Sequence, residues 1–105
     1  MRRGDIYEFR PPKGRGHEQR GKRYGVVVQA AALLPRSVVI VAPTSRSARP
    51  ASFRPEIGIG DQSTRVLVEQ LGAVDATRLG ELVGHVSPEE MWGIDEGLMT
   101  VLGLL

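Results

Sequence analysis

The chain of 105 residues contains no cysteine, so neither a disulfide bond nor a thiolate metal site can form within it. The absence fits a reducing compartment, and we expect the protein to act in the cytoplasm. There are only two histidines, His17 and His85, and their separation in the sequence argues against a zinc site. We therefore expect no metal and no other cofactor.

Long apolar runs are also missing. No stretch is long enough to span a membrane, and Leu33-Leu34 is interrupted by Pro35-Arg36. Met1-Arg2-Arg3 has the basic character of a signal peptide start, but Gly4-Asp5 follows where an apolar segment would be needed. The apolar fraction of 41% supports one small core, and a single domain over residues 1–105 is expected.

Acidic residues are scarce in the first half of the chain, and basic residues are scarce in the second half. Residues 1–54 hold twelve Lys and Arg against three acids, a net of +9, whereas residues 55–105 hold two Arg against nine acids, a net of −7. The basic half is centred on a glycine-spaced loop, residues 12–23, which also carries His17 and Glu18. Such a loop suits a polyanion, although the same pattern is typical of a solvated hairpin tip.

The apolar pattern predicts short strands followed by one helix. The runs 25–29 and 37–42 are β-branched without alternation, which predicts strands buried on both faces. Segments 44–51 and 58–63 are predicted as a loop and a turn region, with a short helical turn around Leu79. The other predicted strands are 6–9, 53–57 (an edge strand), 64–71 and 81–86.

The terminal helix has a well-defined beginning. Ser87 is a good N-cap, Pro88 suits the first helical position, and Glu90 completes a capping box. Short strands followed by one helix predict a mainly β (α+β) fold, a small β-barrel or β-roll with a C-terminal α-helix. The helical residues expected to face the core are Met91, Ile94, Leu98, Val101 and Leu102.

The basic loop has the groups that RNA self-cleavage needs. In that reaction the ribose 2′-hydroxyl attacks the adjacent phosphate, which requires a proton acceptor, a proton donor and positive charge over the phosphorane. Arg23 suits the last task, because its planar guanidinium matches two phosphate oxygens and stays charged. His17 or Glu18 could carry the proton, and no metal is required.

A second polar segment follows the predicted strand 37–42. Thr44, Ser45 and Arg46 could hold phosphate oxygens, although the segment taken alone favours an ordinary Ser/Thr-rich turn. Consecutive strands are usually neighbours, which would place Thr44 beside Arg23. Glu69 and Gln70 interrupt an apolar strand, either as an outward-facing pair in its alternation or with the Gln70 side chain reading a base edge.

Aromatic residues are few, with one Trp, two Tyr and two Phe. Tyr24, beside Arg23, is the best candidate to stack on a base, with core packing as an equal alternative.

Several short motifs occur together in a specific order. They are Arg3-Gly4-Asp5-Ile6-Tyr7, Gly16-His17-Glu18-Gln19, Gly21-Lys22-Arg23, Val39-Ile40-Val41-Ala42-Pro43-Thr44-Ser45, Glu69-Gln70-Leu71, Asp75-Ala76-Thr77-Arg78-Leu79, Gly84-His85-Val86-Ser87 and Leu102-Gly103-Leu104. In this ordered set the chain resembles the MazF/PemK toxins of bacterial toxin–antitoxin systems. The resemblance implies an SH3-like barrel that forms a homodimer and cleaves single-stranded RNA, often mRNA, at short motifs without metal. It also implies a cognate antitoxin that blocks the same groove.

The resemblance also implies roles for individual residues. Arg23 and Thr44 match the usual catalytic pair, with Glu18 as a further acid–base group. Arg23 would stabilise the phosphorane, and Thr44 would position the phosphate or the 2′-hydroxyl. The residues expected to contact RNA are His17, Gln19, Lys22, Tyr24, Ser45, Arg46 and Gln70.

The sequence departs from the family pattern in places. Tyr24-Gly25 stands where Pro-Ala or Pro-Val is usual, and Glu69 stands where Asp is often found. The missing proline removes a fixed φ angle beside Arg23.

Three other functions stay open at this point. One is a gyrase-poisoning toxin resembling CcdB, which depends on a terminal Trp-Gly-Ile. Here Trp92-Gly93-Ile94 lies inside the predicted helix instead, where Ile94 would pack in the core and Trp92 would be partly buried. The others are a non-catalytic RNA-binding barrel and an inactivated toxin that still binds its antitoxin.

Overall fold

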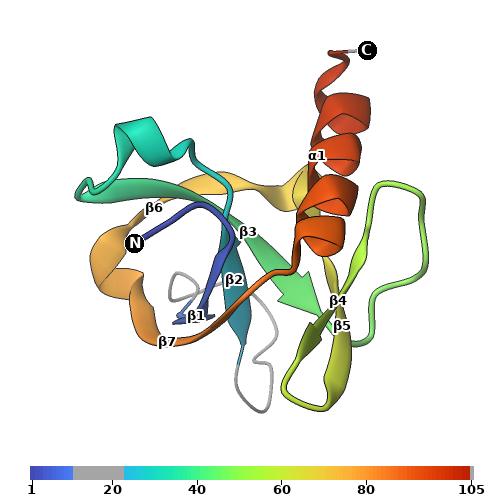
Figure 1. Cartoon of the computed structure of the whole chain (residues 1–105), viewed down its shortest axis with the longest axis horizontal. Coiled ribbons are helices and arrows are strands. Elements are labelled where there is room, and N and C mark those ends of the chain that lie inside the picture. The colour runs from blue at the N-terminus through green and yellow to red at the C-terminus, as the bar shows by residue number, and fades with distance from the viewer. Residues whose placement is uncertain (11–22, 105) are drawn as a thin grey trace.

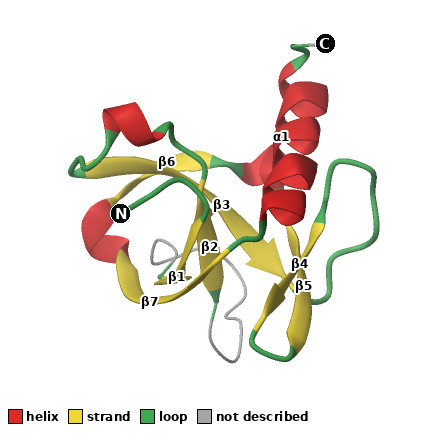
Figure 2. Cartoon of the chain, in the orientation of Figure 1, coloured by secondary structure: helices red, strands yellow, loops and turns green. Residues whose placement is uncertain are grey.

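The computed structural model describes residues 1–10 and 23–104. Strands dominate, and one α-helix ends the chain (Figures 1 and 2). Short 3-10 turns η1 (Ala31–Leu33), η2 (Val68–Gln70) and η3 (Ala76–Arg78) connect the strands. The remaining elements are β1 (Asp5–Phe9), β2 (Tyr24–Val27), β3 (Val38–Ser45), β4 (Glu56–Ile59), β5 (Gln62–Val66), β6 (Gly72–Asp75), β7 (Leu79–His85) and α1 (Pro88–Leu102).

The strands form one curled antiparallel sheet in the order β4-β5-β3-β2-β1-β7, with β6 paired to β3 off this path. β3 is the longest strand, and its two halves have different neighbours. Its first half pairs with β6 and its end pairs with β5, through Thr44 opposite Val66 and Ser45 opposite Arg65. The mainly β fold with a terminal helix is therefore as predicted.

The core lies on both faces of β2. Val26 packs in a cluster with Ile57, Val68 and Ile94, which α1 helps to close, and Val27 packs in a second cluster with β3. The prediction that this strand is buried on both faces is confirmed. The same prediction for residues 37–42 was wrong, because side chains alternate along β3 and only one face of its first half is covered. There Val38 and Ile40 are exposed, whereas Val39 and Val41 are buried.

The helix begins as the sequence predicts. Ser87 Oγ accepts a hydrogen bond from the Glu90 backbone N–H at 3.1 Å, and Glu90 Oε1 accepts one from the Ser87 N–H at 2.8 Å. Ile94 is fully buried, but Leu102 is 54% exposed, so its predicted core position was wrong. Leu102 belongs to the last helical turn, which projects beyond the sheet in Figure 1, where no element covers it.

Three boundaries differ from those predicted. Residues 58–63 form a hairpin between β4 and β5, with Gly60 in the left-handed region at φ +62°. The predicted strand 64–71 ends at Val66, and its continuation is η2 followed by β6, which the sequence analysis missed. Thr44 and Ser45 extend β3 beyond Pro43, because the β5 backbone is available to pair with them.

The sequence around the N-terminus is held by a buried carboxylate. Asp5 Oδ1 lies 2.8 Å from His85 Nδ1, and Asp5 Oδ2 accepts a hydrogen bond from the Arg2 N–H at 2.7 Å. Burial raises the pKa of Asp5, but these hydrogen bonds and the nearby positive charges outweigh it, so the pKa lies below its ordinary value. The carboxylate thus fastens β1 to β7.

Within residues 1–10 and 23–104, no helix is long and apolar enough to cross a membrane.

Gly25 leaves room for the Val41 side chain of β3. A Cβ at this position would lie 2.6 Å from Val41 Cγ1, so the buried Val41 side chain or the strands around it would have to shift. We expect Gly25→Ala to lower the free energy of unfolding by about 1–3 kcal/mol in urea titrations, the usual cost of overpacking. In β6 nothing lies within 4 Å of a Cβ at Gly72, so Gly72→Ala should change stability by less than about 0.5 kcal/mol. Equal effects would contradict this account.

Asp5→Asn removes the charge but keeps the shape. Because the folded-state pKa of Asp5 is lowered, its ionised form stabilises the fold above the ordinary carboxyl pKa of about 3.9, and this contribution is lost as the pH falls through the folded-state value. We expect the variant to be about 1–3 kcal/mol less stable at pH 7, with the difference from the parent shrinking on acidification. Urea titrations across pH 2–7 test this, and a difference independent of pH would contradict it.

Candidate functional site

Thr44 and the segment around Arg23 meet where β2 and β3 pair. Gly25 lies opposite Pro43 in the antiparallel register, so Tyr24 and Thr44 are next along the pair. Thr44 is 5% exposed, and its Oγ1 donates a hydrogen bond of 3.0 Å to the Tyr24 carbonyl oxygen. The prediction that these two segments are neighbours is confirmed.

Arg23 stands immediately before β2 and is half-buried. Its carbonyl oxygen accepts a hydrogen bond of 2.9 Å from the Phe9 N–H, which ties it to the end of β1. Burial lowers the pKa of Arg23, although a guanidinium stays charged at neutral pH. Its Nε is buried and has no hydrogen-bond partner in the part of the chain that the structure describes. A partly desolvated guanidinium is suited to an anionic ligand.

Ser45 and Arg46 continue from Thr44. Ser45 Oγ accepts a hydrogen bond of 3.3 Å from the Ser47 N–H, which is the Ser/Thr turn that the sequence analysis kept as an alternative. Arg46 is exposed. The turn directs the chain out of β3 directly after Thr44, so a turn and a phosphate-binding role are compatible.

Tyr24 is half-buried and packs against the core cluster that contains Val26. Tyr24 was predicted either to stack on a base or to pack in the core, and the structure shows the core contact.

Gln70 reaches the neighbourhood of β3 through η2. The Leu67 N–H donates a hydrogen bond of 2.8 Å to the Pro43 carbonyl oxygen, which places the start of η2 beside the strand that carries Thr44. Gln70 is exposed at the end of this turn. The interpretation of Glu69 as an outward-facing strand residue was wrong, because η2 replaces the strand and an arginine captures the carboxylate.

That arginine, Arg54, was missed by the sequence analysis. Its Nε and Nη2 donate hydrogen bonds of 3.0 and 2.6 Å to Glu69 Oε2. Burial would raise the pKa of Glu69, but the hydrogen bonds and charge of Arg54 lower it below its ordinary value. No local sequence pattern links these residues, because they are 15 positions apart and neither belongs to a periodic run.

Several predicted site residues cannot be placed. Glu18, predicted as catalytic, lies outside the described residues, as do the predicted RNA contacts His17, Gln19 and Lys22. In the ranges 1–10 and 23–104, no group of three or more His, Asp or Glu side chains could hold a metal ion.

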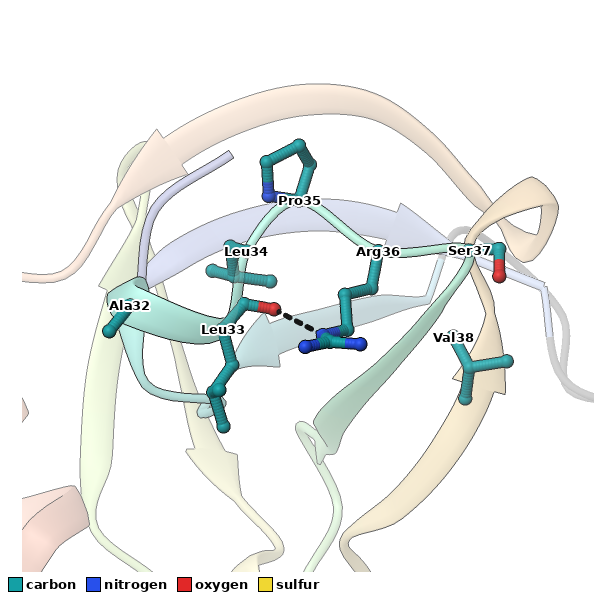
Figure 3. A pocket seen from close by; sticks show the side chains of 7 residues that line it. All are labelled: Ala32, Leu33, Leu34, Pro35, Arg36, Ser37 and Val38. Atoms are coloured by element: carbon teal, nitrogen blue, oxygen red, sulfur yellow. Dashed lines mark hydrogen bonds between the residues drawn. The ribbon is translucent and has the colours of Figure 1, made fainter.

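A separate open cavity of about 450 Å³ lies at the other end of β3 and is lined by residues 32–38 (Figure 3). Its one charged side chain, Arg36, donates a hydrogen bond of 3.1 Å from Nε to the Leu33 carbonyl oxygen. Because β3 is extended, the cavity and Thr44 are about 20 Å apart. The cavity is therefore distinct from the Arg23–Thr44 site.

Comparison with known proteins gives a consistent family. Residues 2–102 match the model of the PemK-like, MazF-like toxins of type II toxin–antitoxin systems. The Mycobacterium tuberculosis protein named "Putative toxin Rv3098A" is 41% identical over 105 residues, which cover 97% of each chain.

Solved structures agree in fold. A mycobacterial endoribonuclease in complex with its cognate antitoxin superposes with a TM-score of 0.81 at 22% identity, covering 100% of this chain and 97% of that one. MazF from Deinococcus radiodurans gives a TM-score of 0.78 at 21% identity, covering 98% and 96%. The fold class predicted from the sequence is thereby confirmed. The chain belongs to the PemK-like, MazF-like toxins of type II toxin–antitoxin systems.

Proposed function

We propose that the protein is an endoribonuclease toxin that cleaves single-stranded RNA, with mRNA as the main target, by 2′-hydroxyl transesterification without metal. The observation that carries this proposal is the half-buried Arg23 guanidinium, directly before Tyr24, whose carbonyl oxygen accepts the hydrogen bond from the Thr44 hydroxyl. Family membership supports it, and two of the structural neighbours are endoribonucleases from mycobacteria.

In this proposal Arg23 supplies the positive charge over the reacting phosphate. The phosphorane carries more negative charge than the starting diester, so a fixed guanidinium stabilises the transition state more than the substrate. Its burial strengthens this interaction, because little water competes for it.

Thr44 positions the reacting group. Its hydroxyl proton is already used in the hydrogen bond to the Tyr24 carbonyl oxygen, which leaves the Oγ1 lone pairs as acceptors. Oγ1 can therefore accept a hydrogen bond from the ribose 2′-hydroxyl and hold it near the phosphate. As the 2′ oxygen attacks, its proton passes to Glu18, the proposed proton acceptor, and the leaving 5′ oxygen takes a proton from Arg23 or water.

The remaining predicted contacts extend the binding surface. Ser45 and Arg46 would contact phosphates on one side of the scissile bond, and Gln70 would read a base edge. His17, Gln19 and Lys22 of the basic loop, with the Tyr24 ring, are proposed to contact the same RNA strand.

A second copy and an antitoxin complete the proposal. We propose that the toxin is a homodimer, which the exposed apolar residues Leu82 (55%) and Val83 (38%) on the edge strand β7 support. One structural neighbour is described as a complex with its cognate antitoxin, which supports a similar protein partner here.

The gyrase-poisoning alternative is not favoured by the structure. Ile94 is fully buried, so Trp92-Gly93-Ile94 is not displayed as a unit. Trp92 itself is 68% exposed, so the expectation of partial burial was wrong. The helix turns this residue away from the sheet, whereas Ile94 faces it.

The cleavage assay uses a long single-stranded RNA with EDTA present. The parent should cut at specific sites and leave 5′-hydroxyl ends, while Arg23→Ala and Thr44→Ala should each lower the rate by at least about a hundredfold with the fold intact. Arg36→Ala, at the opposite end of β3, serves as the matched control and should cut at the parental rate. Unchanged cleavage in Arg23→Ala would overturn the catalytic assignment.

Two other outcomes of that assay have distinct meanings. Binding without cutting by the parent would identify a non-catalytic RNA-binding barrel, and inhibition of gyrase with intact RNA would identify a gyrase poison.

Sedimentation equilibrium tests the proposed dimer. We expect twice the monomer mass of 11.4 kDa at micromolar concentration, and a shift toward monomer in Leu82→Glu, because a charge cannot be buried unpaired at an apolar interface. Glu81→Gln is the control, since it alters the adjacent exposed position on β7 without adding a charge. A monomeric parent would contradict the dimer.

A further inference from the structure

Arg54 makes hydrogen bonds to several separate segments of the chain. Besides its two hydrogen bonds to Glu69, its Nη1 donates a hydrogen bond of 3.2 Å to the Arg49 carbonyl oxygen. Its own carbonyl oxygen accepts a hydrogen bond of 2.8 Å from Arg65 Nη1. The Arg54 side chain therefore joins the β3–β4 connection (residues 46–55) to η2, and its backbone carbonyl oxygen adds a bond to β5.

Both partners of this ion pair are partly buried. The Arg54 side chain is 24% exposed and the Glu69 side chain is 22% exposed. Glu69 Oε1 is buried and makes no close hydrogen bond among the described residues. Arg54 is the main compensation for this charge, with smaller contributions to the lowered pKa of Glu69 from its own backbone N–H and the neighbouring Gln70 side chain. Removal of a partner from such a pair is much more disruptive than loss of a surface ion pair.

The residues that precede the pair are fixed on a common support. A Cβ at Gly97 of α1 would lie 3.1 Å from the Phe53 carbonyl oxygen and 3.1 Å from Val68 Cγ2. The β3–β4 connection and η2 therefore both pack against α1 at Gly97. One residue later in each segment, Arg54 and Glu69 join them a second time.

This double attachment lies between proposed RNA contacts. Arg46 belongs to the β3–β4 connection, and Gln70 directly follows Glu69. Val68 is fully buried, Glu69 is held by Arg54, and Gln70 is exposed, so the three residues of η2 point in different directions. A rotation of η2, which the Arg54–Glu69 bond resists, would move the Gln70 amide relative to β3.

We propose that Arg54 and Glu69 are positioning residues that hold Gln70 and the β3–β4 connection at a fixed separation, and thereby set the RNA base selectivity of the toxin. The inference rests on the proposed function. Neither side chain belongs to the Arg23–Thr44 pair, so they act on recognition and leave the reacting groups in place.

The selectivity test uses two RNA oligonucleotides: the preferred cleavage site and the same site with one base changed. In Glu69→Gln and Arg54→Lys, we expect the ratio of kcat/KM values between the two RNAs to fall about tenfold or more. The kcat for the preferred site should stay within about threefold of the parent, with the change appearing mainly in KM. The reversed pair Arg54→Glu/Glu69→Arg should restore part of the selectivity.

Asp95→Asn provides the matched control. It removes another charged hydrogen bond of 2.7 Å, from Arg3 Nη2 to Asp95, which joins the N-terminal segment to α1 instead of joining η2 to the β3–β4 connection. Its selectivity should equal that of the parent. Equal loss of selectivity in Asp95→Asn, or parental selectivity in both pair variants, would overturn the proposal.

A measurement on the free protein separates this inference from the proposed function. In hydrogen exchange, the Arg54 and Leu71 amides, which bond to the Ala51 and Val68 carbonyl oxygens, should exchange about tenfold faster in Glu69→Gln and Arg54→Lys. The Val26 amide of the central strand should keep its parental rate. If the parent cuts no RNA, the proposed function fails while this result still decides the positioning role, and unchanged exchange at Arg54 and Leu71 would overturn that role.

Discussion

The antiparallel pairing of β2 with β3 is the constraint on which the rest of the structure depends. It buries Val26 and Val27 on opposite faces of one strand, so both apolar clusters form around it. It also places Thr44 where its hydroxyl bonds to the Tyr24 carbonyl oxygen, beside the chain segment of Arg23. Gly25 leaves space for the Val41 side chain within this pair, since a Cβ would lie 2.6 Å from Val41 Cγ1. The same strand pairing therefore builds both the core and the candidate site.

The basic and acidic halves of the chain contribute to different parts of the structure around this pairing. The basic half of the sequence contributes Arg23 and Arg46 to the proposed RNA surface, and the acidic half contributes α1 and most of the later strands. Acids from the second half also hold basic residues from the first, as Glu69 holds Arg54 and Asp95 holds Arg3. The opposite charges of the two halves thus serve partly to join them.

The sequence predicts what depends on local pattern. The helix start follows from Ser87 and Glu90, the buried β2 from its β-branched run, and the neighbourhood of Arg23 and Thr44 from strand order. The sequence does not reveal features that depend on distant pairing. β6 was missed because its partner is β3, and the Arg54–Glu69 pair has no local signature. The glycine in Tyr24-Gly25, which departs from the family pattern, is explained only by the structure, because the Val41 side chain lies against it across the sheet.

The central claim is that the ribose 2′-hydroxyl attacks the phosphate at the Arg23–Thr44 site. The most direct measurement compares a cleavable RNA oligonucleotide with one that carries a single 2′-deoxy nucleotide before the scissile phosphate. The account predicts that the substituted RNA binds with similar affinity and is not cut, whereas the unmodified RNA yields a 2′,3′-cyclic phosphate. Cleavage of the 2′-deoxy RNA at the same bond would contradict it.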